Sequence, residues 1–211
     1  MEPRIEPRQG LFTNLLAAGA RKSFGREMKS SRVFANHPWM MVGFMRFNRA
    51  AERTPHVPKP LAELAVLRAA TMVGCPFCID IASEYSRRTG LTDDQLLSLN
   101  DAHGCGLFDA DQLMVIDLAT GMSSTPGQVD DELMERVEAR LGVKGTMELV
   151  QLIAWENARS RQNVALGIDA EGFSEGKTCA LPYAAAGIDS MSITNRNLTS
   201  PASIRSGAEA A

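Results

Sequence analysis

The spacing of apolar and polar positions predicts a chain built from helices. Apolar residues recur every three or four positions along most of the sequence, whereas the strict alternation of a half-buried strand is hard to find. Breakers and capping residues divide this pattern into segments. The helices that we expect lie at residues 11–24, 38–53, 59–73, 76–89, 92–102, 109–121, 129–140 and 145–167.

Two of these predicted helices, at 59–73 and 145–167, are apolar around most of their circumference. A helix of this kind usually lies at the centre of a bundle or is covered by another subunit. β-Branched and aromatic residues do not cluster into strand-like runs anywhere. We therefore predict an all-α fold class, a helical bundle with a well-filled core.

The amino-acid composition of the chain changes near residue 169. Beyond this point Gly, Ser, Ala, Asn and Thr dominate, and the helical periodicity is lost. Such a segment lacks the apolar surface to form a core of its own. We predict one helical domain over residues 1–168, with its core at about 30–168, followed by a C-terminal tail or oligomerisation arm over 169–211.

Length and charge narrow the function classes. A chain of 211 residues suits one domain, and a formal net charge of −3 argues against a nucleic-acid-binding face. No stretch approaches the ~20 apolar residues that span a bilayer, and the charged N-terminus lacks the apolar region of a secretory signal. We expect a cytoplasmic protein that binds neither nucleic acid nor membrane.

Cys75 and Cys78 carry the strongest chemical signal. Gly74 ends one predicted helix and Pro76 suits the first turn of the next, so both thiols lie at a helix N-terminus. Unpaired N–H groups and the helix dipole favour a thiolate there, which is the form that attacks peroxides and disulfides. The spacing lets one sulfur resolve a sulfenic acid formed on the other.

Two other interpretations of the cysteine pair exist, a structural zinc half-site and two inert core thiols. A zinc site needs two further ligands, for which His103 and Cys105 are candidates. Structural CxxC knuckles normally lie in turns between short strands, and a thioredoxin-like motif needs a βαβ context. This chain has neither pattern, and no flavin, nicotinamide or haem motif is evident. We expect a redox-capable pair with no metal and no cofactor.

The arrangement Glu63-x11-Cys75-x2-Cys78, followed by a helix, resembles the AhpD-like alkylhydroperoxidase core of the carboxymuconolactone decarboxylase superfamily. The segment from His37 (HPWMMVGFMRFNRA), the segment TGLTDDQLLSL and the segment from Trp155 (WENARSRQNVALGI) are similar to flanking helices of that family. The resemblance covers about residues 30–168. It implies an AhpD-like bundle with a helix–CxxC–helix hairpin, assembled as a homotrimer or hexamer.

The resemblance also implies roles. Cys78 would be the thiolate that attacks the peroxide, Cys75 would resolve it, and Glu63 would accept a proton through water. The physics of a helix terminus alone favours Cys75, the first position, as the attacking thiol. The implied activity is a thiol-dependent peroxidase that reduces hydroperoxides through a dithiol/disulfide cycle, with a dithiol reducing partner protein that restores the thiols.

The sequence departs from the family pattern at two positions. Ala82 stands where the fuller motif has a histidine one turn after the second cysteine, and Phe77 stands where some members have another. General acid–base help is typically worth about 10²–10⁴-fold in rate. Tyr85, two turns after Cys78, carries a hydroxyl, but packing is its more common role.

Two alternatives to a peroxidase therefore stay open. A carboxymuconolactone decarboxylase-like lyase would use a histidine-based acid–base site, and family members of that kind generally lack the redox CxxC. The intact cysteine pair and Ala82 weigh against it. A non-enzymatic helical oligomer that senses redox state through its thiols would tolerate the missing histidine.

The other histidine, thiol and polar residues are not expected to carry the redox chemistry. His37 precedes Pro38 and should cap a helix, and His56 between two prolines should be exposed. His103 lies in a glycine-flanked loop from which it could reach a site in the folded oligomer. Cys105 and Cys179 lie outside the motif. Three polar residues line the last predicted helix, and we expect them to form hydrogen bonds on the helix surface and at a subunit interface: Asn157, Arg161 and Asn163.

Overall fold

The computed structural model describes residues 3–10, 13–14, 18, 21 and 28–180. Within this part of the chain all regular elements are helices, which confirms the predicted all-α class. None of the helices described is long and apolar enough to span a membrane. The elements are α2 (Lys29–Phe34), α3 (Pro38–Ala51), α4 (Lys59–Val73), α5 (Pro76–Arg88), α6 (Asp93–Ser98), the 3₁₀ turn η1 (Leu99–Asp101), α7 (Ala110–Ser123) and α8 (Asp131–Leu166).

Side chains that cap the helices explain where several of them begin. The side chain of His37 accepts a hydrogen bond from the backbone N–H of Met40, so its predicted capping role is confirmed. Thr92 and Asp109 each form a capping box with the glutamine three residues later. The predicted helix at 11–24 falls largely outside the described residues, and α2 is a short helix that the pattern did not predict.

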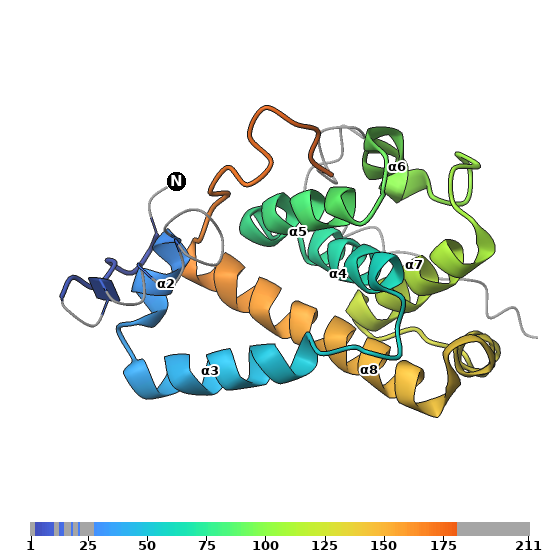
Figure 1. Cartoon of the computed structure of the whole chain (residues 1–211), viewed down its shortest axis with the longest axis horizontal. Helices are drawn as coiled ribbons and strands as arrows, with labels where there is room; N and C mark the ends of the chain where they lie inside the picture. Colours follow the sequence, from blue (N-terminus) through green and yellow to red (C-terminus); the bar gives the residue numbers. More distant parts are fainter. Residues whose placement is uncertain (1–2, 11–12, 15–17, 19–20, 22–27, 181–211) are drawn as a thin grey trace, which may run out of the picture.

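Helix α8 changes direction at Gly142. Its backbone has φ 66° and ψ 170° there, a conformation that interrupts the helix and that glycine adopts without a Cβ penalty. Figure 1 shows the segment before Gly142 nearly end-on and the segment after it crossing the view. The sequence pattern predicted two helices, 129–140 and 145–167, and the bend separates the same two segments.

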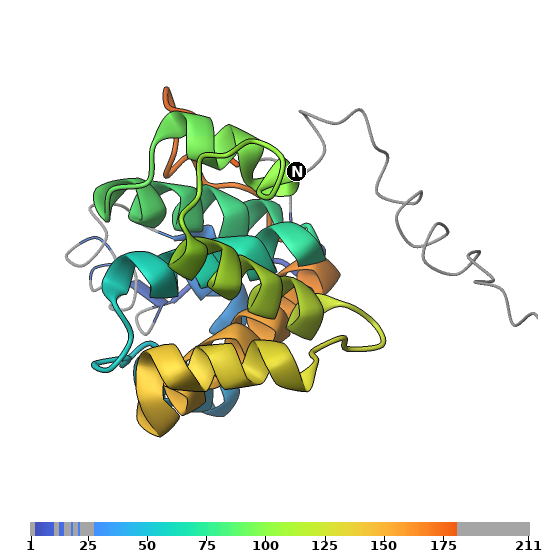
Figure 2. The ribbon, with the colours of Figure 1, turned by 90° about the vertical axis from the view of Figure 1, so that its right-hand side faces the viewer.

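Helix α4 lies at the centre of the bundle, with α5, α7 and the second part of α8 packed around it (Figures 1 and 2). Leu64 and Leu67 are fully buried, as are Val115 of α7 and Leu149 of α8. Burial of such a side chain is worth about 1.5–3 kcal/mol relative to exposure. This packing holds the corner between α4 and α5 against α8, which places the cysteine pair beside the last helix.

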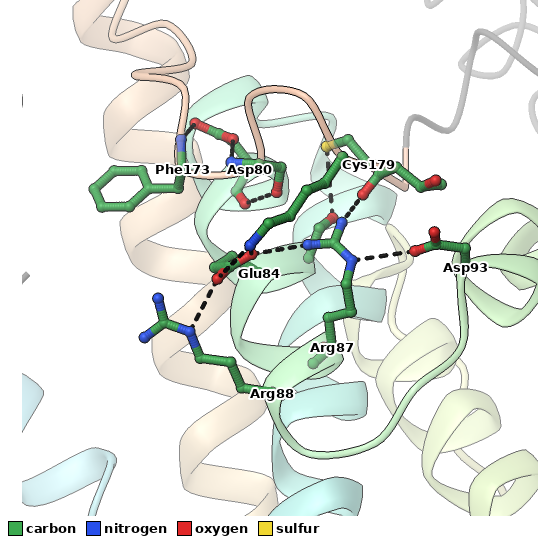
Figure 3. Close-up of polar contacts among 12 residues, drawn as sticks. Asp80, Glu84, Arg87, Arg88, Asp93, Phe173 and Cys179 are labelled. Atoms are coloured by element: carbon green, nitrogen blue, oxygen red, sulfur yellow. Dashed lines mark hydrogen bonds and ion pairs between the residues drawn. The ribbon is translucent and has the colours of Figure 1, made fainter.

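Residues 169–180, which we call the strap, return along the outer face of α5 (Figure 3). The buried carboxylate of Asp80 accepts backbone N–H bonds from Glu171 at 3.0 Å, Phe173 at 2.9 Å and Ser174 at 2.7 Å. This part of the predicted tail therefore packs on its own chain. The rest of the predicted tail, residues 181–211, lies outside the described residues.

A second carboxylate on α5 ties the other half of the strap. Glu84, whose side chain is 8% exposed, accepts hydrogen bonds from Lys177, Arg87 and Arg88, and Arg87 also donates to the backbone carbonyl of Thr178 (Figure 3). Burial acts to raise the pKa of Glu84. The hydrogen bonds and positive charges of Lys177 and Arg88 outweigh burial, so the pKa lies below its ordinary value of 4.5.

This ion-pair cluster predicts that the strap loosens in acid. Because the pKa of Glu84 is lower in the folded state, its stabilisation is fully present above the ordinary pKa and is lost as pH falls through the lowered one. We expect the free energy of unfolding to fall less in Glu84→Gln than in the wild type between about pH 6 and pH 3. Urea unfolding at several pH values measures this. Equal losses in the two proteins would show that Glu84 does not contribute.

Candidate redox site

The backbone at the α4–α5 corner places Cys75 at the N-cap of α5. Gly74 ends α4 in the left-handed region, with φ 74°, and Pro76 begins α5. The side chain of Cys75 then accepts a hydrogen bond from the backbone N–H of Cys78, with 3.2 Å between Sγ and N. A sulfur in this position takes the place of the usual oxygen cap and lies at the positive end of the helix dipole.

The two thiols are free and face each other. Their Sγ atoms are 2.6 Å apart, and both residues are buried, at 0% and 3% exposure for Cys75 and Cys78. The predicted helix–CxxC–helix hairpin is thus present. A pair this close can pass between dithiol and disulfide with little movement of the backbone.

The surroundings of the two thiols separate their acidities. The hydrogen bond with the Cys78 thiol is the largest influence on Cys75 and lowers its pKa, helped by the N–H of Cys78 and the hydroxyl of Ser160 against the effect of burial. The same thiol–thiol bond, together with burial and the charge of Glu156, raises the pKa of Cys78. The first proton to leave the pair therefore comes from Cys75.

Helix α8 supplies the polar groups around the sulfurs. Asn163 donates from Nδ2 to the Sγ of Cys78 at 3.3 Å. Its Oδ1 is buried and accepts no hydrogen bond from the described part of the chain. Ser160 and Glu156, one and two turns before, are both fully buried. The negative charge of Glu156 adds to the rise in the pKa of Cys78 and opposes the lowering of the pKa of Cys75.

The expectation that the polar residues of the last helix lie on its surface is wrong for Asn157 and Asn163. Asn163 reaches the cysteines, and Asn157 donates to the hydroxyl of Ser123 at 2.8 Å in the interior. Arg161 is exposed and donates to Oδ1 of Asn157 at 2.6 Å. Among the buried polar residues, Glu156, Ser160 and Asn163 follow the helix period and form one polar stripe on the buried face of α8.

Glu63 lies on α4, close enough to Glu156 for the two charges to interact. Its side chain is half-buried, and burial raises its pKa above the ordinary value. The charges that act on it come from Lys59, Glu52, Arg159 and Glu156. The structure thus brings Glu63 to the neighbourhood of Glu156, and Glu156 is the carboxylate that acts on the thiols.

The positions that depart from the family motif are filled by packing residues. Ala82 is buried in the core, and the ring of Phe77 packs edge-on against Phe173 of the strap, with centroids 6.1 Å apart. Burial raises the pKa of Tyr85, and the Arg88 guanidinium lies over its ring. These contacts support the packing role expected for Tyr85.

The remaining histidines and cysteines lie elsewhere. His103 pairs with Asp117 at 2.7 Å, and His56, which is exposed, pairs with Glu148 at 2.6 Å. Cys105 donates to the carbonyl of Ala102. Among the residues that the structure describes, no three His, Cys, Asp or Glu side chains gather as a metal ion would require.

Known proteins include relatives of this chain in sequence and in fold. No protein-family model matches the chain. The chain is similar to the protein YnjA of Escherichia coli K12, with 30% identity over 164 residues, which cover 77% of this chain and 87% of YnjA.

Solved structures share the architecture. A peroxidase-related protein with an alkylhydroperoxidase AhpD core, from Ralstonia eutropha JMP134, has a TM-score of 0.68 at 13% identity and covers 81% of this chain and 94% of its own. The debrominase Bmp8, solved in complex with 2,3,4-tribromopyrrole, has a TM-score of 0.69 at 16% identity and covers 82% and 94%. At these identities the likeness concerns the fold, and it confirms the AhpD-like architecture that the sequence predicted.

Proposed function

This chain belongs to one family with YnjA of Escherichia coli and has the fold of the AhpD-like proteins, and on that basis we propose that it is a thiol-dependent peroxidase that reduces hydroperoxides through Cys75 and Cys78. One observation carries the proposal. The two Sγ atoms are 2.6 Å apart, and one of them accepts a backbone N–H at a helix N-terminus, which is the arrangement that activates a thiolate.

The cycle has two chemical steps and a recovery. The Cys75 thiolate attacks one oxygen of the hydroperoxide, so that an S–O bond forms and the O–O bond breaks, and the departing alkoxide takes a proton to become an alcohol. The Cys78 thiol then attacks the sulfenic sulfur, its proton joins the departing hydroxide to form water, and a disulfide remains. A dithiol reducing partner protein restores both thiols by exchange.

This order reverses the one that the family resemblance implies, in which Cys78 attacks. The reason is the place of Cys75 at the N-cap of α5, where its sulfur accepts the backbone N–H of Cys78, and the lowered pKa of Cys75 agrees with this. Glu63 keeps its proposed role as a proton acceptor through water, at the outer edge of the site, where burial raises its pKa. Asn163, whose buried Oδ1 has no partner in the described part of the chain, would accept the O–H of the incoming hydroperoxide.

The lyase alternative has less support. It requires a histidine for acid–base work, but in this chain His37 caps α3, His56 pairs with Glu148, and His103 pairs with Asp117. The debrominase Bmp8 shares the fold but is a different enzyme. Rapid oxidation of the thiols by a hydroperoxide separates a peroxidase from such a relative.

The proposal is tested on the reduced wild-type protein with one equivalent of an alkyl hydroperoxide. We expect rapid loss of two hydrogens by intact mass spectrometry and a cross-link between Cys75 and Cys78 in the peptide map, with Cys105 and Cys179 still reduced. Oxidation no faster than that of free cysteine would overturn the proposal. Rapid oxidation without turnover in the presence of excess dithiol would point to a sensor instead.

We also propose the homotrimer or hexamer that the resemblance implies. Trp39 and Met40 of α3 are 83% and 59% exposed, and α3 and α8 border an apolar hollow of about 280 Å³ lined in part by Phe47 and Trp155. An exposed apolar surface of this kind commonly marks a contact with another subunit. Native mass spectrometry gives the number of subunits, and a monomer would contradict this.

A further inference from the structure

Asn163 is a buried asparagine whose side chain contacts the cysteine pair. Its exposed fraction is 4%, and its Nδ2 donates to the Sγ of Cys78 at 3.3 Å. Its Oδ1 is buried and accepts no hydrogen bond from the part of the chain that the structure describes. Within that part, the bond to the Cys78 sulfur is therefore the only hydrogen bond of this side chain.

The stability of the fold does not explain this asparagine. A buried amide oxygen without a partner has lost its hydration and destabilises the folded state, and a thiol sulfur is a weak acceptor for the amide N–H. Asn157, six residues earlier on the same helix, has both ends satisfied, because Nδ2 donates to Ser123 at 2.8 Å and Oδ1 accepts from Arg161 at 2.6 Å. A buried polar group that destabilises the fold beside reactive thiols indicates a role in their chemistry.

The bond from Asn163 to Cys78 becomes stronger when the sulfur carries negative charge, because hydrogen bonds to charged groups are about twice as strong as neutral ones. In the first step of the proposed cycle the charge belongs to Cys75, whose sulfur accepts the backbone N–H at the start of α5. Charge builds on the Cys78 sulfur only in the second step, when this sulfur attacks its neighbour 2.6 Å away. The Nδ2–H group of Asn163 therefore favours the second step.

We infer that Asn163 is the residue that positions Cys78 for closure of the disulfide, an inference that rests on the proposed function. In this step the Sγ of Cys78 bonds to the Sγ of Cys75, the S–O bond of the sulfenic acid breaks, and the Cys78 proton joins the departing hydroxide as water. The Nδ2–H group stabilises the charge on the Cys78 sulfur until the S–S bond is complete. Fast closure leaves a second hydroperoxide little time to convert the sulfenic acid to a sulfinic acid, which thiol exchange does not restore.

Asn163→Leu tests this role, because it replaces the amide by an apolar group with the same number of heavy atoms. The reduced variant is mixed with enough alkyl hydroperoxide for closure to limit disulfide formation, quenched with acid after set times and analysed by intact mass spectrometry. Closure is intramolecular, so its rate constant does not depend on the hydroperoxide concentration or on the first step.

The expected result for Asn163→Leu is closure about 10–100-fold slower than in the wild type. The sulfenic acid should then live long enough for a 1,3-dione reagent to trap it, and excess hydroperoxide should give a sulfinic acid on Cys75. Closure at the wild-type rate would overturn the inference.

The free energy of unfolding separates positioning from a purely structural role. Because the Oδ1 of Asn163 is unpaired, Asn163→Leu should leave this free energy unchanged or raise it. Asn157→Leu is the matched control. It removes hydrogen bonds at both ends of a buried amide, so it should lower the free energy of unfolding and still close the disulfide at the wild-type rate. Slow closure in both variants, in proportion to the stability that each loses, would show that Asn163 acts only through the fold.

Asn163→Ala is the second variant, and it decides the matter if the leucine variant does not fold. It removes the amide without adding volume and should show the same slow closure, whereas the wild-type rate would again refute the role of Asn163. The proposed function fails in a different way. In that case the wild type itself forms neither a sulfenic acid nor a disulfide rapidly, and the inference falls with it.

Discussion

Cys78→Ser is expected to stop turnover completely while it leaves the first oxidation intact. In this variant Cys75 keeps its place at the N-cap of α5, where the backbone N–H at position 78 still supports a thiolate. One equivalent of hydroperoxide should therefore convert Cys75 to a sulfenic acid that no second thiol resolves. A 1,3-dione reagent traps that species, and mass spectrometry locates it.

Cys75→Ser is expected to lose both steps. Burial and the charge of Glu156 both act to raise the pKa of the remaining Cys78 thiol, and neither depends on Cys75, so little thiolate is present near neutral pH. Oxidation should slow to the rate of an unactivated thiol or below. The Cys105→Ser, Cys179→Ser double variant serves as the control and should react like the wild type.

The pair of variants also decides the order of the cysteines. Trapped sulfenic acid on Cys75 in the Cys78→Ser variant supports the order argued here from hydrogen bonds and charge. Trapped sulfenic acid on Cys78 in the Cys75→Ser variant, with none in the reverse variant, would restore the order implied by the family resemblance. Loss of the first oxidation in both variants would mean that each thiol needs the other for its activation.

Asp80→Ala is expected to give the largest loss of stability among single polar substitutions. The buried carboxylate of Asp80 accepts three backbone N–H groups of the strap, and hydrogen bonds to a charged group are worth about 1.5–3 kcal/mol each. Because the strap can leave α5 and rehydrate, the total loss should be about 2–4 kcal/mol rather than the sum. Urea unfolding measures this free energy.

Hydrogen exchange shows where that loss occurs. In Asp80→Ala the amides of Glu171, Phe173 and Ser174 should exchange much faster, while amides in the centre of α4 should keep their relative protection. The control is Asp131→Ala, an exposed aspartate at the start of α8. Slow exchange at the strap in Asp80→Ala would show that other contacts, such as those of Lys177 and Phe173, hold it in place.

Local signals made most of the fold predictable. Each break between helices has a residue whose chemistry forces it, such as the proline after His37, the aspartate that caps α7 at position 109 and the glycine at 142. Helices α3, α4, α5 and α7 span 13 to 15 residues, which is long enough for the apolar period to identify them as helices. The short helix α2 spans six residues, fewer than two turns, and a pattern of that length carries little periodic information.

The candidate site was predictable only where its residues are neighbours in sequence. Cys75 and Cys78 are three positions apart, so a helix start brings them together. Asn163 meets Cys78 across 85 positions through the packing of α8 on α5. A signal did exist, because Glu156, Ser160 and Asn163 repeat at helical spacing and continue the apolar face of Leu149 and Ile153. Polar residues on such a stripe face a buried partner rather than water.

The strap illustrates a different limit. Its composition resembles a disordered tail, and nothing in the segment itself predicts that it packs. The reason lies on α5, where Asp80 offers a buried carboxylate that only backbone N–H groups from elsewhere can satisfy. An aspartate inside a predicted helix usually indicates a solvated side chain. The sequence therefore did not show that the Asp80 carboxylate accepts hydrogen bonds from another segment.

The position of Cys75 at the N-cap has a thermodynamic consequence. The amide of Cys78 and the dipole of α5 lower the free energy of the thiolate, which belongs to the reduced form, and they offer little to an uncharged disulfide. A closed cycle of reduction and ionisation therefore gives the pair a higher reduction potential than two unconstrained cysteines. A more oxidising disulfide accepts electrons more readily, so the cap that activates the thiol toward peroxide also favours its recovery by the reducing partner.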